Sequence, residues 1–104
     1  MTLHEIQAFV VSIDPNARHY DSAHRHGEPY TVWKEGPTLG MTGDGRHMGG
    51  LRFRIHRFAK RESDAIAAAL FAALEERDDI AFAYENDYEP DTGYIHHIFD
   101  CEGI

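Results

Sequence analysis

Apolar and polar residues alternate in three stretches of the chain, and this pattern predicts half-buried β-strands. The clearest stretch is 51–58, where every second residue up to Ile55 is apolar and the residues between them are basic. Alternation is also clear at 80–85 and is less regular at 94–101. A fourth strand is predicted at 29–35, which is rich in aromatic and β-branched residues and is bounded by a proline and a glycine.

Two further segments have apolar residues at spacings of three and four, which predicts amphipathic helices. The first covers 3–12; Thr2 and Glu5 match a capping box at its start, and Pro15 ends it. The second helix begins after Ser63, which we expect to be its N-cap. Its expected buried stripe consists of Ile66, Leu70 and Leu74.

The predicted elements follow the order α-β-β-α-β-β. We therefore expect an α+β fold, in which a mostly antiparallel four-stranded sheet carries two helices packed on one face. The 104 residues are enough for a single domain, 1–104, with one hydrophobic core. In segment 36–50, six of fifteen residues are glycine, and we expect a flexible loop there.

Composition limits the classes of partner. The formal net charge of -8 argues against nucleic acid and against an anionic membrane surface. The sequence has no run of about 20 apolar residues that could span a membrane. A lone cysteine, Cys101, excludes an intramolecular disulfide, and the N-terminus lacks the pattern of a signal peptide. Together these features favour synthesis in the cytoplasm.

Eight histidines make a metal site worth testing. His24 and His26 are too close for a helical pair, and on a strand both rings would lie on one face, whereas His96 and His97 would point to opposite faces of a strand. Cys101 would lie roughly 13 Å along the strand from His97, too far for direct proton transfer. No zinc or nucleophile motif is present. We therefore expect no catalytic residue, cofactor or metal site. The alternative is a small histidine-containing metal- or ligand-binding module, with or without hydrolytic activity.

Charge is segregated along the chain. Six Lys and Arg residues and no acidic residue lie in 46–61, whereas eight acidic residues and one arginine lie in 75–91. Ordinary solvated faces would account for this pattern. A sharper hypothesis is a head-to-tail contact between subunits, which closes into a ring when the rotation allows it. The residues predicted for this contact are Arg52, Arg54 and Arg57 on one side and Glu85, Asp87 and Glu89 on the other.

Four segments together cover most of the chain: IDPNARHYDS, EPYTVWKEG, LRFRIHRFAKRESDAIAAALFAAL and YEPDTGYIHHIFDCEG. In their order and length they resemble the small tail-completion proteins, or tail terminators, of long-tailed phages and prophages, a family also described as minor capsid or head–tail joining proteins. The glycine-rich loop stands where that family has a variable hairpin, and its composition departs from the family's pattern.

The resemblance implies a non-enzymatic structural subunit of the virion tail, assembled in the cytoplasm of the host bacterium. Its implied partners are other copies of itself in a ring, commonly a hexamer, together with the tail-tube protein and a head-side neck or connector protein. The resemblance transfers no functional-site residues, so the predicted contact rests on the charge pattern alone.

Overall fold

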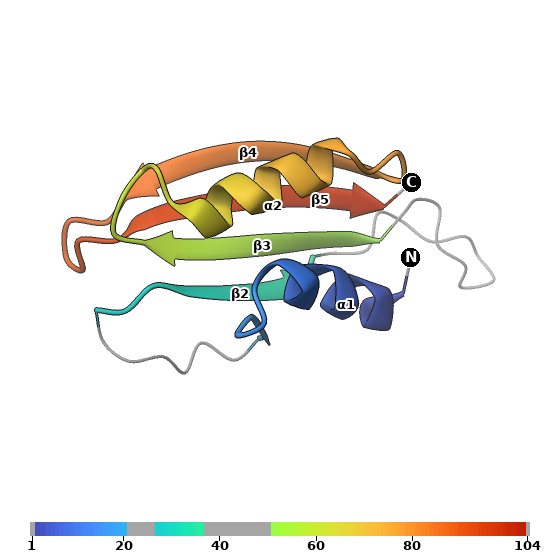
Figure 1. Ribbon diagram of the computed structural model, residues 1–104, viewed down its shortest axis with the longest axis horizontal. Coiled ribbons are helices and arrows are strands. Elements are labelled where there is room, and N and C mark those ends of the chain that lie inside the picture. Colours follow the sequence, from blue (N-terminus) through green and yellow to red (C-terminus); the bar gives the residue numbers. More distant parts are fainter. Residues whose placement is uncertain (1, 21–26, 37–50, 104) are drawn as a thin grey trace.

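The computed structural model describes residues 2–20, 27–36 and 51–103 of the chain. They form two helices and five strands that share one hydrophobic core (Figure 1). In chain order the elements are α1 (Leu3–Ile13), β1 (Arg18–His19), β2 (Tyr30–Glu35), β3 (Arg52–Ala59), α2 (Ala65–Glu75), β4 (Ile80–Tyr88) and β5 (Ile95–Gly103). The predicted α+β class is confirmed. Apart from Gly36, the predicted glycine-rich loop lies outside the described residues.

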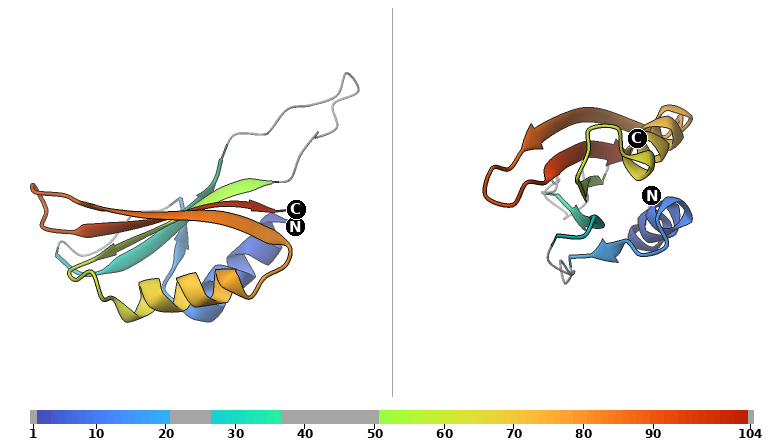
Figure 2. Two further views of the ribbon diagram at one scale, coloured as in Figure 1. Left: turned by 90° about the horizontal axis from the view of Figure 1, so that it is seen from above. Right: turned by 60° about the vertical axis from the view of Figure 1, so that its left-hand side comes forward.

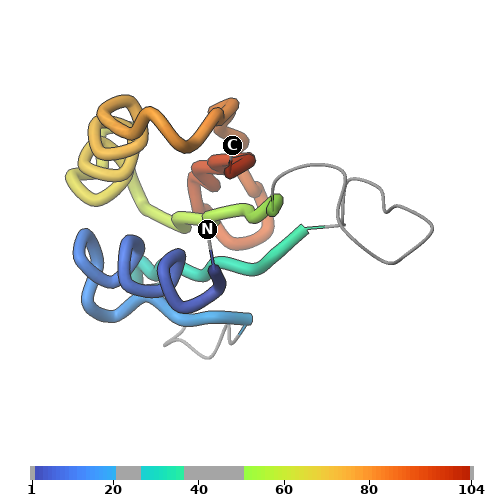
Figure 3. Tube along the Cα trace, turned by 90° about the vertical axis from the view of Figure 1, so that its right-hand side faces the viewer, coloured from blue at the N-terminus to red at the C-terminus, as the bar shows by residue number. Residues whose placement is uncertain are grey.

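The strands form one mixed sheet in the order β1-β2-β3-β5-β4. All neighbouring strands are antiparallel except β1 and β2, which run parallel. Both helices lie on the same side of the sheet, and none of the described residues forms a helix on the other side (Figure 2, left). Figure 3 shows α1 and α2 side by side along that covered face. The prediction of four strands is corrected to five.

The helix boundaries follow from their caps. The Thr2 hydroxyl accepts from the Glu5 amide at 3.1 Å, and the Glu5 carboxylate accepts from the Thr2 amide at 2.9 Å, which confirms the predicted capping box. The N-cap of α2 is Asp64 rather than the predicted Ser63. Asp64 takes this position because its carboxylate accepts from the Ala67 amide at 2.9 Å.

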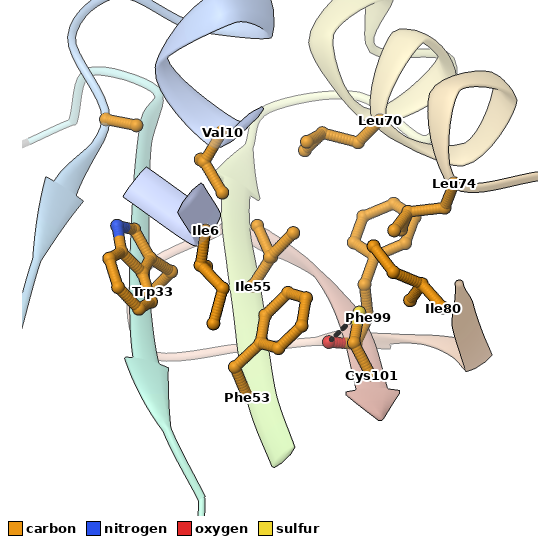
Figure 4. Packing of buried hydrophobic residues seen from close by; sticks show 11 residues of the cluster. Ile6, Val10, Trp33, Phe53, Ile55, Leu70, Leu74, Ile80, Phe99 and Cys101 are labelled. Carbon is orange, nitrogen blue, oxygen red and sulfur yellow. Dashed lines mark hydrogen bonds between the residues drawn. The ribbon is translucent and has the colours of Figure 1, made fainter. Parts of the chain in front are cut away.

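The core lies between the two helices and the covered face of the sheet (Figure 4). Ala67, rather than the predicted Ile66, completes the buried stripe of α2, and Ile66 is only partly buried. The largest fully buried apolar side chains are Ile6 and Val10 from α1, Leu70 and Leu74 from α2, and Trp33, Phe53, Ile55 and Phe99 from the sheet. Neither helix in the described part of the chain is long and apolar enough to cross a bilayer.

Candidate functional site

The sheet face opposite the two helices, which we call the open face, holds most of the residues that the charge pattern singled out. Side chains alternate between the two faces of a strand, and Phe53, Ile55 and Phe99 point into the core. The strand register therefore assigns the intervening residues to the open face. These are Tyr30, Val32 and Lys34 of β2, Arg52, Arg54, His56 and Phe58 of β3, His96, Ile98, Asp100 and Glu102 of β5, and Ala81, Ala83, Glu85 and Asp87 of β4.

An aromatic row crosses one end of the open face. Tyr30, Phe58 and His96 occupy adjacent positions on β2, β3 and β5. The ring centroids of Tyr30 and Phe58 are 4.5 Å apart, and those of Phe58 and His96 are 4.1 Å apart, with the planes nearly parallel in both pairs. At this end of the face, the three strands β2, β3 and β5 therefore present packed rings.

Two imidazole rings meet beside this row. His56 Nδ1 lies 2.7 Å from His96 Nε2, so one ring donates its N–H and the other accepts. Burial lowers the pKa of His56 to about 4. The positive charge that His96 takes up on protonation acts in the same direction, as do the charges of Lys34 and Arg54. Burial also lowers the pKa of His96, against the opposing effect of nearby carboxylates. Protonation of both rings would remove the acceptor, so the pair is disrupted in acid.

Three carboxylates gather around His96, and we call them the acidic corner. Glu89 Oε2 lies 3.5 Å from His96 Nδ1. Glu85 and Asp87 follow the same strand edge, are exposed, and also favour the charged form of His96. The structure thus brings together the three acidic residues of the predicted contact. Glu89 also accepts a hydrogen bond from the Thr92 hydroxyl at 3.1 Å, so it also stabilises the turn between β4 and β5.

Arg52 and Arg54 lie with Lys34 at the diagonally opposite end of the open face, which we call the basic corner. Asp100 and Glu102 oppose the two arginines on β5. Arg54 Nη2 is 3.5 Å from Asp100 Oδ2, and the two side chains are 54% and 44% exposed. Such an exposed pair contributes little energy, but it offsets part of the positive charge.

Arg57 does not belong to this corner, and its assignment to the subunit contact is wrong. It lies on the covered face, is only 7% exposed, and pairs with Asp64 at 2.8 Å and Asp14 at 3.6 Å. The odd spacing from Arg52 and Arg54 places it among the inward-facing residues of β3. These contacts within the chain leave Arg57 unavailable to a second subunit.

The other candidate groups are separated by the sheet. His96 and His97 point to opposite faces, as predicted, and His97 Nδ1 lies 2.7 Å from the Tyr84 hydroxyl under α2. Cys101 is buried, and burial raises the pKa of its thiol to about 12. Among the described residues, no group of three His, Cys, Asp or Glu side chains is placed to hold a metal ion. His24 and His26 lie outside the described residues.

The sequence matches no protein-family model and no curated protein with which it was compared.

Proposed function

We propose that the protein is a ring-forming structural subunit of a long-tailed phage or prophage tail, which caps the tail tube and joins it to the head. The proposal rests on the resemblance of the four sequence segments to tail-completion proteins and on the charge layout of the open face. In this role its partners are neighbouring copies of itself, the tail-tube protein and a head-side neck protein. Its location is then the virion tail.

One observation carries the proposed self-association: the basic and acidic corners lie at opposite ends of one face. Lys34, Arg52 and Arg54 are on β2 and β3, whereas Glu85 and Asp87 are on the edge strand β4. The basic corner of one copy complements the acidic corner of another. Copies that lie side by side would form a head-to-tail contact, which closes into a ring where the rotation allows it, whereas two copies placed face to face about a two-fold axis would match both corners in a dimer.

The strength of the attraction between the basic and acidic corners depends on how far their charged groups are removed from water. Exposed ion pairs contribute about 0–1 kcal/mol each, and salt weakens them. The part-neutralisation of Arg54 by Asp100 lowers the gain further. The charges therefore set the orientation and specificity of the contact. We expect the apolar side chains between the two corners, Val32 and Ile98, to supply the buried area.

A charge-swap experiment tests this contact. Light scattering after size exclusion should show that R52E/R54E and E85K/D87K each abolish the association of the wild-type chain, measured alone or with the tail-tube protein added. Mixing the two variants should restore it, because each reversed corner then meets a reversed partner. High salt should weaken the association of the wild-type chain and of the mixture.

E75K/E76K is the matched control, because it makes the same change in charge at two exposed residues at the end of α2. This variant should associate like the wild-type chain. A wild-type chain that stays monomeric at high concentration, even with the tail-tube protein present, would contradict the ring. Association that survives both corner variants would contradict the corners as its cause.

A further inference from the structure

We infer that the outer edge of β4 binds an extended segment of another protein, whose side chains alternate between apolar and basic. β4 is a nine-residue edge strand, and no described strand pairs with its outer side. Residues 83–88 are all exposed, and the side chains include Tyr84 and Tyr88, at 37% and 60% exposure. A long exposed edge offers unpaired main-chain groups that an added strand can satisfy.

The side of this edge that belongs to the open face is acidic. Glu85 and Asp87 project there, two residues apart. With the described residues, neither carboxylate forms a hydrogen bond or ion pair, and the charge that they face is that of His96 when it is protonated. A strand laid along β4 would bring every second side chain against this acidic row. Basic residues at those positions would be complementary.

The other side of the same edge is apolar. Between α2 and β4 lies a groove of about 550 Å³, and its walls include Ala68, Phe71 and Ala72 of α2 and Tyr84 of β4. The rings of Phe71 and Tyr84 pack edge to face, with their centroids 5.5 Å apart. The small side chains of the two alanines leave space along this flank of the helix. Ala68 and Ala72 are exposed. Apolar side chains of an added strand would fill this space and cover the alanines.

The two sides together define the partner. Main-chain hydrogen bonds to an edge strand supply affinity for any extended segment, and alternate side-chain positions supply specificity. Here one set of positions meets carboxylates and the other meets an apolar groove. An alternating apolar and basic strand satisfies both sets, whereas an acidic strand would face like charges.

This site does not depend on the ring. The two contacts share Glu85 and Asp87, but the ring also needs Arg52 and Arg54, whereas strand addition needs the α2–β4 groove. A bound segment would therefore displace a neighbouring subunit, and the two contacts can be separated by substitution.

The probe is a capped peptide of about eight residues that alternates arginine and valine, long enough to cover most of β4. Titration into the ¹⁵N-labelled protein should shift the amide signals of residues 81–88 and of Ala68 and Ala72. It should also slow amide exchange along β4. A peptide with the same residues in two blocks, one of arginine and one of valine, controls for general attraction to an acidic protein.

Four variants locate the site. E85K/D87K removes the acidic row, and Ala68→Phe fills the groove. Each change should raise the Kd of the alternating peptide about tenfold or more. Ala69→Phe changes an exposed alanine that does not line the groove, and should bind like the wild-type protein. R52E/R54E should lose self-association while retaining the peptide. This last result separates failure of the ring from failure of the strand site.

Three results would overturn the inference. The first is an absence of shifts along β4 at millimolar peptide. The second is equal binding of the alternating and blocked peptides. The third is a set of β4 shifts in R52E/R54E, in which the ring contact is absent, that depend on protein concentration without peptide; this would assign the edge to a second copy of the chain.

Discussion

Arg57 and Asp64 join the central strand to the start of a helix through two hydrogen bonds. Arg57 Nε donates to Asp64 Oδ2 at 2.8 Å, and Nη2 donates to Oδ1 at 3.2 Å. The same carboxylate caps α2 by accepting from the Ala67 amide. Arg57 also lies 3.6 Å from Asp14, the residue that ends α1. One buried guanidinium therefore fixes the end of one helix and the beginning of the other against β3.

Replacing Arg57 should be strongly destabilising. In Arg57→Ala, two partly or fully buried carboxylates lose their cation, and we expect the free energy of unfolding to fall by about 3 kcal/mol. Urea unfolding followed by circular dichroism measures the change. Arg54→Ala is the matched control, because Arg54 is exposed and its ion pair is weak; the expected change is within about 0.5 kcal/mol. Similar losses in both variants would contradict a special role for Arg57.

Asp64 should make stability depend on pH in acid. Burial alone would raise the pKa of Asp64, but the hydrogen bonds from Arg57 and the Ala67 amide outweigh it and hold the pKa below its ordinary value of 3.8. A lowered pKa contributes stability that is complete above pH 3.8 and is lost as pH falls through the folded-state value. Asp64→Asn keeps an N-cap residue but removes this contribution.

The free-energy difference between wild type and Asp64→Asn should therefore be largest near neutral pH and shrink below pH 3.8. Urea unfolding across this range measures it. Asp78→Asn, at an exposed carboxylate beyond α2, should follow the wild-type curve. A difference that stays constant through the acid range would show that Asp64 acts only as a cap.

His56 should lower stability at mildly acidic pH. Its pKa is about 4 in the folded protein against 6.5 in a free chain, because the ring is partly buried beside His96. As pH falls from 6.5, the unfolded chain takes up a proton that the folded protein does not, so stability declines until about pH 4. The full difference in pKa corresponds to roughly 3 kcal/mol, and screening of the partly exposed ring reduces this to about 1–2 kcal/mol.

Replacing His56 by glutamine should make the free energy of unfolding depend less steeply on pH between 6.5 and 4. The dependence that remains is the part due to His96. NMR titration of the imidazole carbons gives the folded-state pKa independently. His4→Gln, on the exposed side of α1, should leave the slope unchanged. A His56 that titrates near 6.5 in the folded protein would disprove the effect.

The sequence predicted elements wherever local periodicity was strong. The capping box of Thr2 and Glu5 and the inward face of 51–58 were both confirmed. β1 was not predicted because two residues carry no period; they form a strand only through their parallel pairing with Val32 and Trp33. Such pairing depends on tertiary structure, which the local pattern does not contain.

The candidate contact shows the same limit. Arg57 was grouped with Arg52 and Arg54 by charge, although its parity with Ile55 already placed it on the inward face. The pairs Arg54–Asp100 and His56–His96 had no comparable signal, because they depend on the β3–β5 register. Charge along a sequence therefore gives candidates, and register decides which charges are already matched within the chain.

The single tryptophan should report the docking of α1 on the sheet. Trp33 is 1% exposed, and its indole Nε1 donates to Gln7 Oε1 at 2.6 Å. Gln7→Leu removes the acceptor and leaves a buried N–H without it, so we expect a loss of about 1–3 kcal/mol in the free energy of unfolding. Gln7→Glu supplies a carboxylate acceptor at the same place and should recover most of that loss. Fluorescence emission measures the change around Trp33, and urea unfolding measures the change in the free energy of unfolding. Equal destabilisation by both variants would show that Gln7 acts through packing rather than through the hydrogen bond.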